Sequence, residues 1–281
     1  MKRLLQVVLI PATLFWAWAN VSFSEASPQL PSNPHVQLVY RPAHVTGLKS
    51  VAADVKKWEV LEQFGQFMVP LRLPRKLVVQ FDECGGLNRS YQPGGPVTVC
   101  YELVDKIERV AANVQPEQRN LVLVGTIIQA VFHDSAIAVF DVLQVPIWGR
   151  EDDAADRLAA FLMVEFGPDL AKPLIIGTAR FFKESDQTWT GSQFADKTSP
   201  EAQRFYNYLC IAFGSDSKTF AFVQAQDGID ITLPRSRAVR CEGEFQQVRK
   251  AFNLRIMPYV DPDLLIDVRS RPWSLFTDAN P

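Results

Sequence analysis

The sequence predicts an α+β domain in which a small sheet packs on a buried central helix. Lys76 to Cys84 and Val97 to Cys100 are rich in β-branched residues and separated by the turn residues "NRSYQPGG", which is typical of strands. Pro116 to Leu143 carries apolar residues around most of its circumference, as a helix buried on all sides does. Arg150 to Phe166 starts with acidic residues, which suit the positive end of a helix dipole. These segments form the predicted core.

The remaining elements follow from local patterns. Leu48 to Phe67 has apolar residues at three-to-four spacing, which predicts one amphipathic helix. The second strand is expected to become helical near Tyr101. Inside the central segment, "LVLVGTII" is rich in β-branched residues, so a strand there stays an alternative. Three more helices are predicted: Asp169 to Lys183, Pro200 to Phe213 and Arg235 to Phe252.

The N-terminus has the pattern of a secretory signal peptide. Lys2 and Arg3 precede an apolar run from Leu4 to Ala19, which ends at small residues. A single membrane anchor is the alternative, but the run is shorter than the roughly 20 residues that span a bilayer, and it contains Pro11. We therefore expect a secreted or periplasmic protein without a stable membrane anchor. The expected division is a signal peptide at 1–26, a Pro-rich entry segment at 27–46, one domain at 47–260 and a C-terminal tail at 261–281.

Composition excludes one class of partner. The 281 residues are 47% hydrophobic and 21% charged, with a formal net charge of −2. Proteins that bind nucleic acid present a clustered basic surface, which this balance does not favour. We therefore expect no nucleic-acid partner.

Four cysteines, Cys84, Cys100, Cys210 and Cys241, follow the signal segment. An even number in an exported chain indicates two disulfides. Three pairings are open from the sequence. We favour Cys84 with Cys100 and Cys210 with Cys241, because each pair closes a short segment; four free or metal-binding thiols remain the alternative.

The residues with chemical interest begin at His133. A zinc peptidase helix places two His at i and i+4, with a Glu at i+1 that polarises the metal-bound water. Here His133 occupies the first ligand position and Asp134 the position of the base, but Ile137 occupies the second ligand position. In the glutamate-type enzymes a carboxylate of the following helix is the third ligand, with an Asp four residues later. Asp152 and Asp156 have this spacing, so they occupy the positions of ligand and ligand-orienting residue.

Four further motifs carry a family resemblance. They are "CGGLNRSY" from Cys84 to Tyr91, "CYEL" from Cys100 to Leu103, "GREDDAAD" from Gly149 to Asp156, and "QRFYNYLCIAFGSD" from Gln203 to Asp216. In this order they resemble a bacterial family of exported proteins described as zinc metallopeptidases and long catalogued as a domain of unknown function. The resemblance runs from about Trp58 to about Val260, and it implies a zincin-like fold.

This chain differs from that family at the positions of the metal ligands and of the general base. Ile137 cannot coordinate a metal, Asp134 and Asp152 are each one bond shorter than the expected Glu, and Thr198 stands where the family tends to have a His. We therefore expect no peptidase activity and no cofactor, with zinc as the metal if one is bound. The expected partner is a peptide or protein in a cleft near Asn88 and Tyr91. The alternatives are an active metal-dependent hydrolase with an unusual His/Asp site and a structural envelope protein.

Overall fold

The strand patterns produce one parallel sheet. The structure is a computed structural model that describes residues 32–86, 91–186, 198–225, 230–271 and 273. Strands β1 (Val36–Tyr40), β2 (Leu77–Asp82) and β3 (Val97–Cys100) lie in the order β1-β2-β3, with all neighbours parallel. The first strand belongs to the Pro-rich entry segment, which adds an edge to the sheet. The central strand is buried on both faces, as parallel strands usually are. Helix and sheet are mixed, so the α+β prediction is confirmed.

Two short helices, α1 (Thr46–Lys57) and α2 (Val60–Phe67), connect β1 to β2. The prediction of one helix over this stretch was wrong, because Glu59 adopts a left-handed conformation with φ 54° and ends the first helix. This break redirects the chain so that both helices bury their apolar faces, and that burial outweighs the unfavourable conformation of a single residue.

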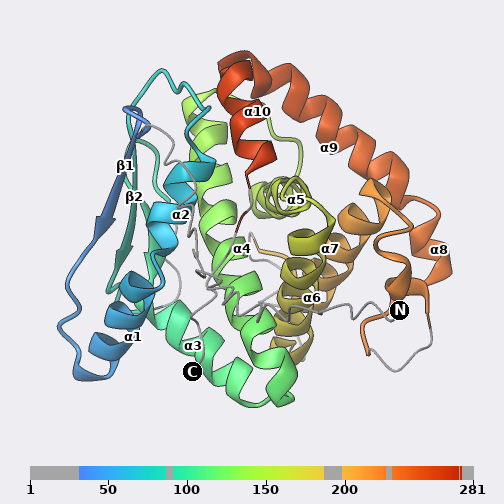
Figure 1. Cartoon of the computed structure of the whole chain (residues 1–281), viewed down its shortest axis with the longest axis horizontal. Helices are drawn as coiled ribbons and strands as arrows, with labels where there is room; N and C mark the ends of the chain where they lie inside the picture. The colour runs from blue at the N-terminus through green and yellow to red at the C-terminus, as the bar shows by residue number, and fades with distance from the viewer. Residues whose placement is uncertain (1–31, 87–90, 187–197, 226–229, 272, 274–281) are drawn as a thin grey trace, which may run out of the picture.

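The central helix α4 (Pro116–Val142) follows α3 (Tyr101–Ala112), and it runs between the sheet and the helices of the second half of the chain (Figure 1). The helical interpretation of "LVLVGTII" is confirmed. Glycines allow α4 to approach α6 (Pro168–Ser185) closely: a Cβ on Gly177 would lie 1.7 Å from the carbonyl oxygen of Leu121. Among the described residues, α4 is the one helix long and apolar enough to cross a membrane, but 94% of its apolar window is buried inside the fold. It is therefore placed as a core helix.

Helices of the second half pack on α4 and on each other (Figure 1). The segment predicted as one helix at Arg235 to Phe252 is divided in two, because the chain leaves the helix at Val239 and resumes at Cys241. In the region expected to be a tail, α10 forms, with Asp261 accepting hydrogen bonds at its start from the amides of Asp263 and Leu264. The bounds are α5 (Glu151–Val164), α7 (Glu201–Ser215), α8 (Arg235–Ala238), α9 (Cys241–Arg255) and α10 (Pro262–Ser270).

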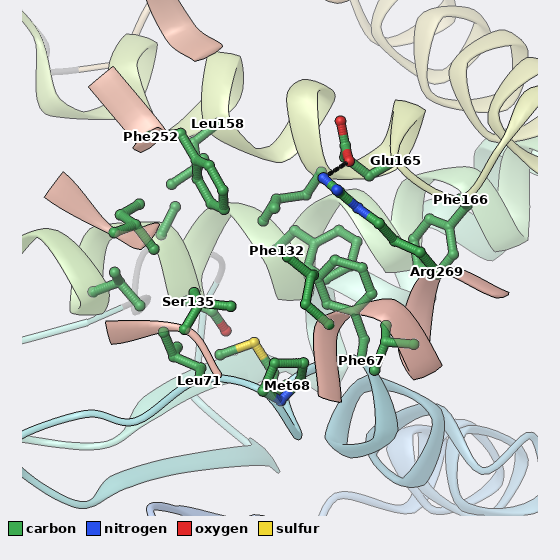
Figure 2. A pocket seen from close by; sticks show the side chains of 18 of the residues that line it. Phe67, Met68, Leu71, Phe132, Ser135, Leu158, Glu165, Phe166, Phe252 and Arg269 are labelled. Atoms are coloured by element: carbon green, nitrogen blue, oxygen red, sulfur yellow. Dashed lines mark hydrogen bonds and ion pairs between the residues drawn. The ribbon is translucent and has the colours of Figure 1, made fainter. Parts of the chain in front are cut away.

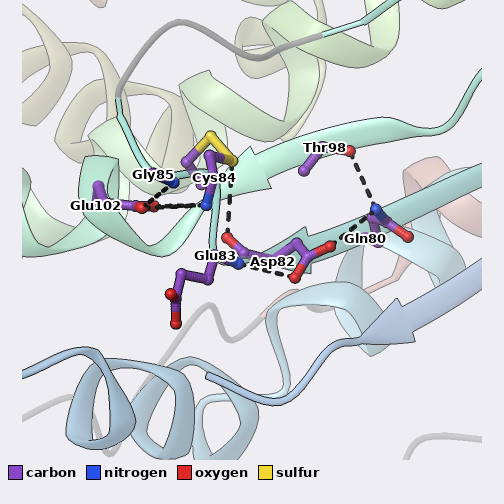
Figure 3. The surroundings of a disulfide bond; sticks show 8 residues. Gln80, Asp82, Glu83, Cys84, Gly85, Thr98 and Glu102 are labelled. Carbon is purple, nitrogen blue, oxygen red and sulfur yellow. Dashed lines mark hydrogen bonds between the residues drawn. A yellow bond between two sulfur atoms is a disulfide. The ribbon is translucent and has the colours of Figure 1, made fainter. Parts of the chain in front are cut away.

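Both disulfide predictions are confirmed. Cys84 is bonded to Cys100 and Cys210 to Cys241, with Cα–Cα distances of 5.5 and 4.9 Å. The first ties the end of β2 to the end of β3, and Glu102 accepts hydrogen bonds from the amides of Cys84 and Gly85 beside it (Figure 3). Two disulfides are typical of proteins that fold in an oxidising compartment.

Candidate functional site

Two successive helices bring the candidate residues together. The turn between α4 and α5 contains two residues with positive φ, Gln144 at 51° and Gly149 at 112°. A glycine suits the second position because it has no Cβ to clash there. The chain then continues into α5, which packs against α4 and opens with an acidic first turn. Asp152 and Asp156, one turn apart on α5, both reach the His133 ring of α4.

His133 lies between these two carboxylates. Its Nδ1 is 2.8 Å from Oδ1 of Asp156, and its Nε2 is 3.6 Å from Oδ1 of Asp152. Burial by itself would lower the pKa of the imidazole, but the charge of Asp156 and the hydrogen bonds of the two aspartates outweigh it and raise the pKa to about 9. His133 is therefore an imidazolium at neutral pH, with a proton on each ring nitrogen.

Asp156 is the centre of a buried hydrogen-bond network. Arg204 of α7 donates to both of its oxygens, from Nε to Oδ2 at 2.7 Å and from Nη2 to Oδ1 at 2.8 Å. Gln129 donates at 3.3 Å, and the Tyr208 hydroxyl lies at 3.4 Å. Burial would raise the pKa of the Asp156 carboxyl, but the charges of Arg204 and His133 hold that pKa well below its usual range. The carboxylate stays ionised because it is surrounded by donors.

Asp152 is contacted by a different segment, the loop that precedes α7. The hydroxyl of Thr198 donates to its Oδ2 at 2.8 Å. Arg150 braces that loop in turn, since its Nη1 donates to the Thr198 carbonyl and lies within 3.3 Å of the Ser199 hydroxyl. Thr198, which was singled out in the sequence as replacing a His of the family, is therefore a direct neighbour of the candidate site.

Two basic and two acidic side chains meet in this network, His133 and Arg204 on one side and Asp152 and Asp156 on the other. Sequence reasoning missed Arg204 and its neighbours Gln129 and Tyr208. A signal was present, because Gln129 and His133, like Arg204 and Tyr208, are polar residues four apart in a helix, which places each pair on one helix face.

The other sequence-predicted residues are placed as follows. Asp134 is buried beside His133 on α4, and Ile137 is buried one turn later. Tyr91 is also buried; its hydroxyl donates to Asp141 at 2.7 Å, near the C-terminal end of α4. Eight residues of helix, or roughly 12 Å, separate Asp141 from His133. Asn88 and the signal segment lie outside the described residues.

The described residues around His133 do not supply the ligand set of a catalytic zinc centre. Such a centre takes three protein ligands. His133 and Asp152 would supply two, but the position one turn later on α4 is Ile137. Within the described part of the chain, the one group of three His, Cys, Asp or Glu side chains that could converge on an ion is Cys84, Cys100 and Glu102. That group is not a metal site, because its two cysteines are joined to each other.

An apolar cavity lies on another face of α4 (Figure 2). Its volume is about 80 Å³, and α4 contributes Phe132, Ser135 and Val139, which share a face that His133 does not. The ion pair of Arg269 with Glu165 stands beside it. This cavity is separate from the charged network. The titratable side chains that line it, Glu165 and Arg269, are paired with each other.

The fold and the site together define the class. It is an α+β protein with a His on its central helix that faces two Asp residues, four positions apart, on the next helix. The chain belongs to the family described as "Putative metallopeptidase", whose model matches residues 40–255. No curated protein and no solved structure matches the chain.

Proposed function

We propose that this chain is a catalytically inactive member of the metallopeptidase family. The observation that carries the proposal is the set of contacts made by His133, which holds Asp156 with one ring nitrogen and faces Asp152 with the other. The residue at the second ligand position, Ile137, is an apolar part of the core. A buried network of charged side chains thus takes the place that a metal centre has in an active relative.

Protonation supports the same proposal. A histidine can ligate a metal only through an unprotonated ring nitrogen. The two aspartates raise the pKa of His133, so a metal that binds its imidazole must first displace a proton held by these carboxylates. Asp152, for its part, is already engaged by the hydroxyl of Thr198. The two remaining ligand positions are therefore committed to contacts within the chain.

We further propose that the protein is exported and binds a peptide or protein without cleaving it. Export is supported by the signal-like N-terminus and by the two disulfides, which are typical of an oxidising compartment. Binding without cleavage is supported by membership of a peptidase family together with the altered ligand set. Mass spectrometry of protein recovered from its native compartment tests export: a chain that still begins at Met1 would contradict it.

The decisive experiment measures zinc affinity by isothermal titration calorimetry in the parent and in the triple variant Ile137→His, Asp134→Glu, Asp152→Glu. The parent should bind zinc weakly and below one ion per chain. The triple variant should bind one ion more tightly, because three ligands and a base then converge on a framework that the helices already hold. The matched control carries Asp134→Glu and Asp152→Glu with Ile137→Leu, and it should behave like the parent.

One observation favours a rival function. His133 Nε2 and Asp152 Oδ1 are only 3.6 Å apart, so a metal held by an unusual His/Asp pair would make the protein an active hydrolase. Elemental analysis after dialysis separates the two functions. One tightly held zinc per chain in the parent would reject the inactive assignment and support the hydrolase.

A further inference from the structure

A second cavity, with a volume of about 730 Å³, opens between α5, α7 and the segment that leads into α8. Arg157 lines it from α5, Tyr206 and Asn207 from α7, and Arg237 from α8. Arg157 follows Asp156 directly on α5, and successive residues of a helix point about 100° apart, so the two side chains serve different sites. We call this space the polar cavity.

Two buried donors of the polar cavity have no acceptor. Nε of Arg157 and Nδ2 of Asn207 are both buried and lack a hydrogen-bond partner within the described residues. Leaving such a donor without an acceptor destabilises the fold, and more so when the donor is charged. Buried donors in folded proteins are normally satisfied, so two that line the same open cavity can take an acceptor from outside the chain, either water or a ligand that displaces it.

The orientation of the Asn207 amide is determined by its neighbour. Arg237 donates from Nη2 to Oδ1 of Asn207 at 3.4 Å, and a guanidinium cannot accept a hydrogen bond. The oxygen of the amide must therefore point to Arg237, which leaves Nδ2 as the free end. Arg237 itself is neutralised by its ion pair with Glu244.

Charge limits the external acceptor to a single negative charge. Arg157 has no ion pair in the described part of the chain, so it is the unneutralised cation of the polar cavity. Asp186 also lines the cavity, and Asp153 lies one turn before Arg157 on α5. These two carboxylates repel a dianion such as phosphate about twice as strongly as a monoanion, because the repulsion scales with the charge of the ligand. A carboxylate matches both the charge and the planar geometry of a guanidinium.

We propose that the polar cavity binds a carboxylate, with Arg157 as its ionic partner and Asn207 as a second donor. Tyr206, Pro200 and Pro234 supply apolar wall surface for the body that carries the carboxylate. The free C-terminus of a peptide and a small carboxylic acid share this chemistry. The proposal does not depend on the state of the His133 site, so either can fail without the other.

The experiment titrates the full-length mature protein by calorimetry with four probes: N-acetyl-Ala-Ala-Phe, the same peptide amidated at its C-terminus, benzoate and inorganic phosphate. The peptide acid should bind at least about tenfold more tightly than its amide, since a charge-assisted hydrogen bond is lost in the amide. Benzoate that binds as tightly as the peptide acid would support a small acid as the source, and weaker benzoate would support a peptide terminus. Failure of both acids to bind at millimolar concentration, or tighter binding of phosphate, would overturn the proposal.

Variants locate the binding site. Arg157→Gln should weaken the better acid by about tenfold or more, and Arg157→Lys should lie between it and the parent, because lysine keeps the charge but not the planar fork. Asn207→Asp should also weaken binding, since it opposes a carboxylate with another. The matched control is Arg249→Gln on exposed α9, which removes the same charge outside the cavity and should leave affinity unchanged. Circular dichroism checks folding; a folded Arg157→Gln or Asn207→Asp protein that binds like the parent would refute the site.

Discussion

Replacing Arg204 with methionine should destabilise the protein far more than loss of an ordinary ion pair. The guanidinium makes two hydrogen bonds to Asp156, at 2.7 and 2.8 Å, and the two side chains are only 16% and 1% exposed. It also stacks on the Phe182 ring, with its central carbon 4.3 Å from the ring centroid. Arg204→Met removes the partner that donates to both oxygens of the buried Asp156 carboxylate.

The loss of unfolding free energy depends on the partners that Asp156 keeps in the variant. Asp156 would keep His133 as its one charged partner, while Asp152 also competes for that imidazolium. Breaking a buried ion pair by removing one partner costs about 3–5 kcal/mol, because the other charge stays buried without compensation. The double variant Arg204→Met, Asp156→Asn removes both charges, so it should recover part of this loss, and the cycle gives the coupling energy of the pair.

Urea unfolding followed by circular dichroism at neutral pH measures the effect as a shift of the midpoint at constant slope. Arg109→Met is the matched control. Arg109 is also paired with an aspartate, Asp105, but its side chain is 70% exposed, so its loss should change stability by less than about 1 kcal/mol. An Arg204→Met protein no less stable than the Arg109→Met protein would show that the buried network contributes nothing to folding.

Two more outcomes are expected. The folded-state pKa of His133 is about 9, against an ordinary 6.5. Its contribution to the free energy of unfolding is therefore fully present below about pH 6.5, and about 3 kcal/mol is lost as the pH rises through 9. A His133→Gln variant whose urea midpoint declines in the same way at alkaline pH would contradict this. Gly177→Ala should lower the free energy of unfolding by about 3 kcal/mol or abolish folding, because the new Cβ would lie 1.7 Å from the Leu121 carbonyl oxygen. The control is Gly47→Ala, whose Cβ would meet nothing within 4 Å and which should be harmless. Equal melting temperatures for the two variants would refute the close packing of α4 on α6.

Several features could be predicted because their causes are local in sequence. The apolar circumference of α4 specifies a buried helix, and the acidic first turn of α5 specifies where the next helix begins. The four-residue spacing of Asp152 and Asp156 puts both carboxylates on one face of a helix wherever that helix packs. The pairings of Cys84 with Cys100 and of Cys210 with Cys241 each close a short segment, and short loops are the least costly to close.

Other features depend on how distant elements pack. The helical break at Glu59 has no strong local signal, since glutamate does not favour a left-handed conformation; the need to bury both α1 and α2 decides it. Arg204 is 48 residues from Asp156, and nothing in its own segment says which carboxylate it meets. The sequence by itself determined that Ile137 stands four residues after His133, where a zinc peptidase helix has its second His. Only the tertiary structure decided which side chains surround His133, because a charge buried far from water must find its partners among whichever side chains the packing brings within hydrogen-bond distance.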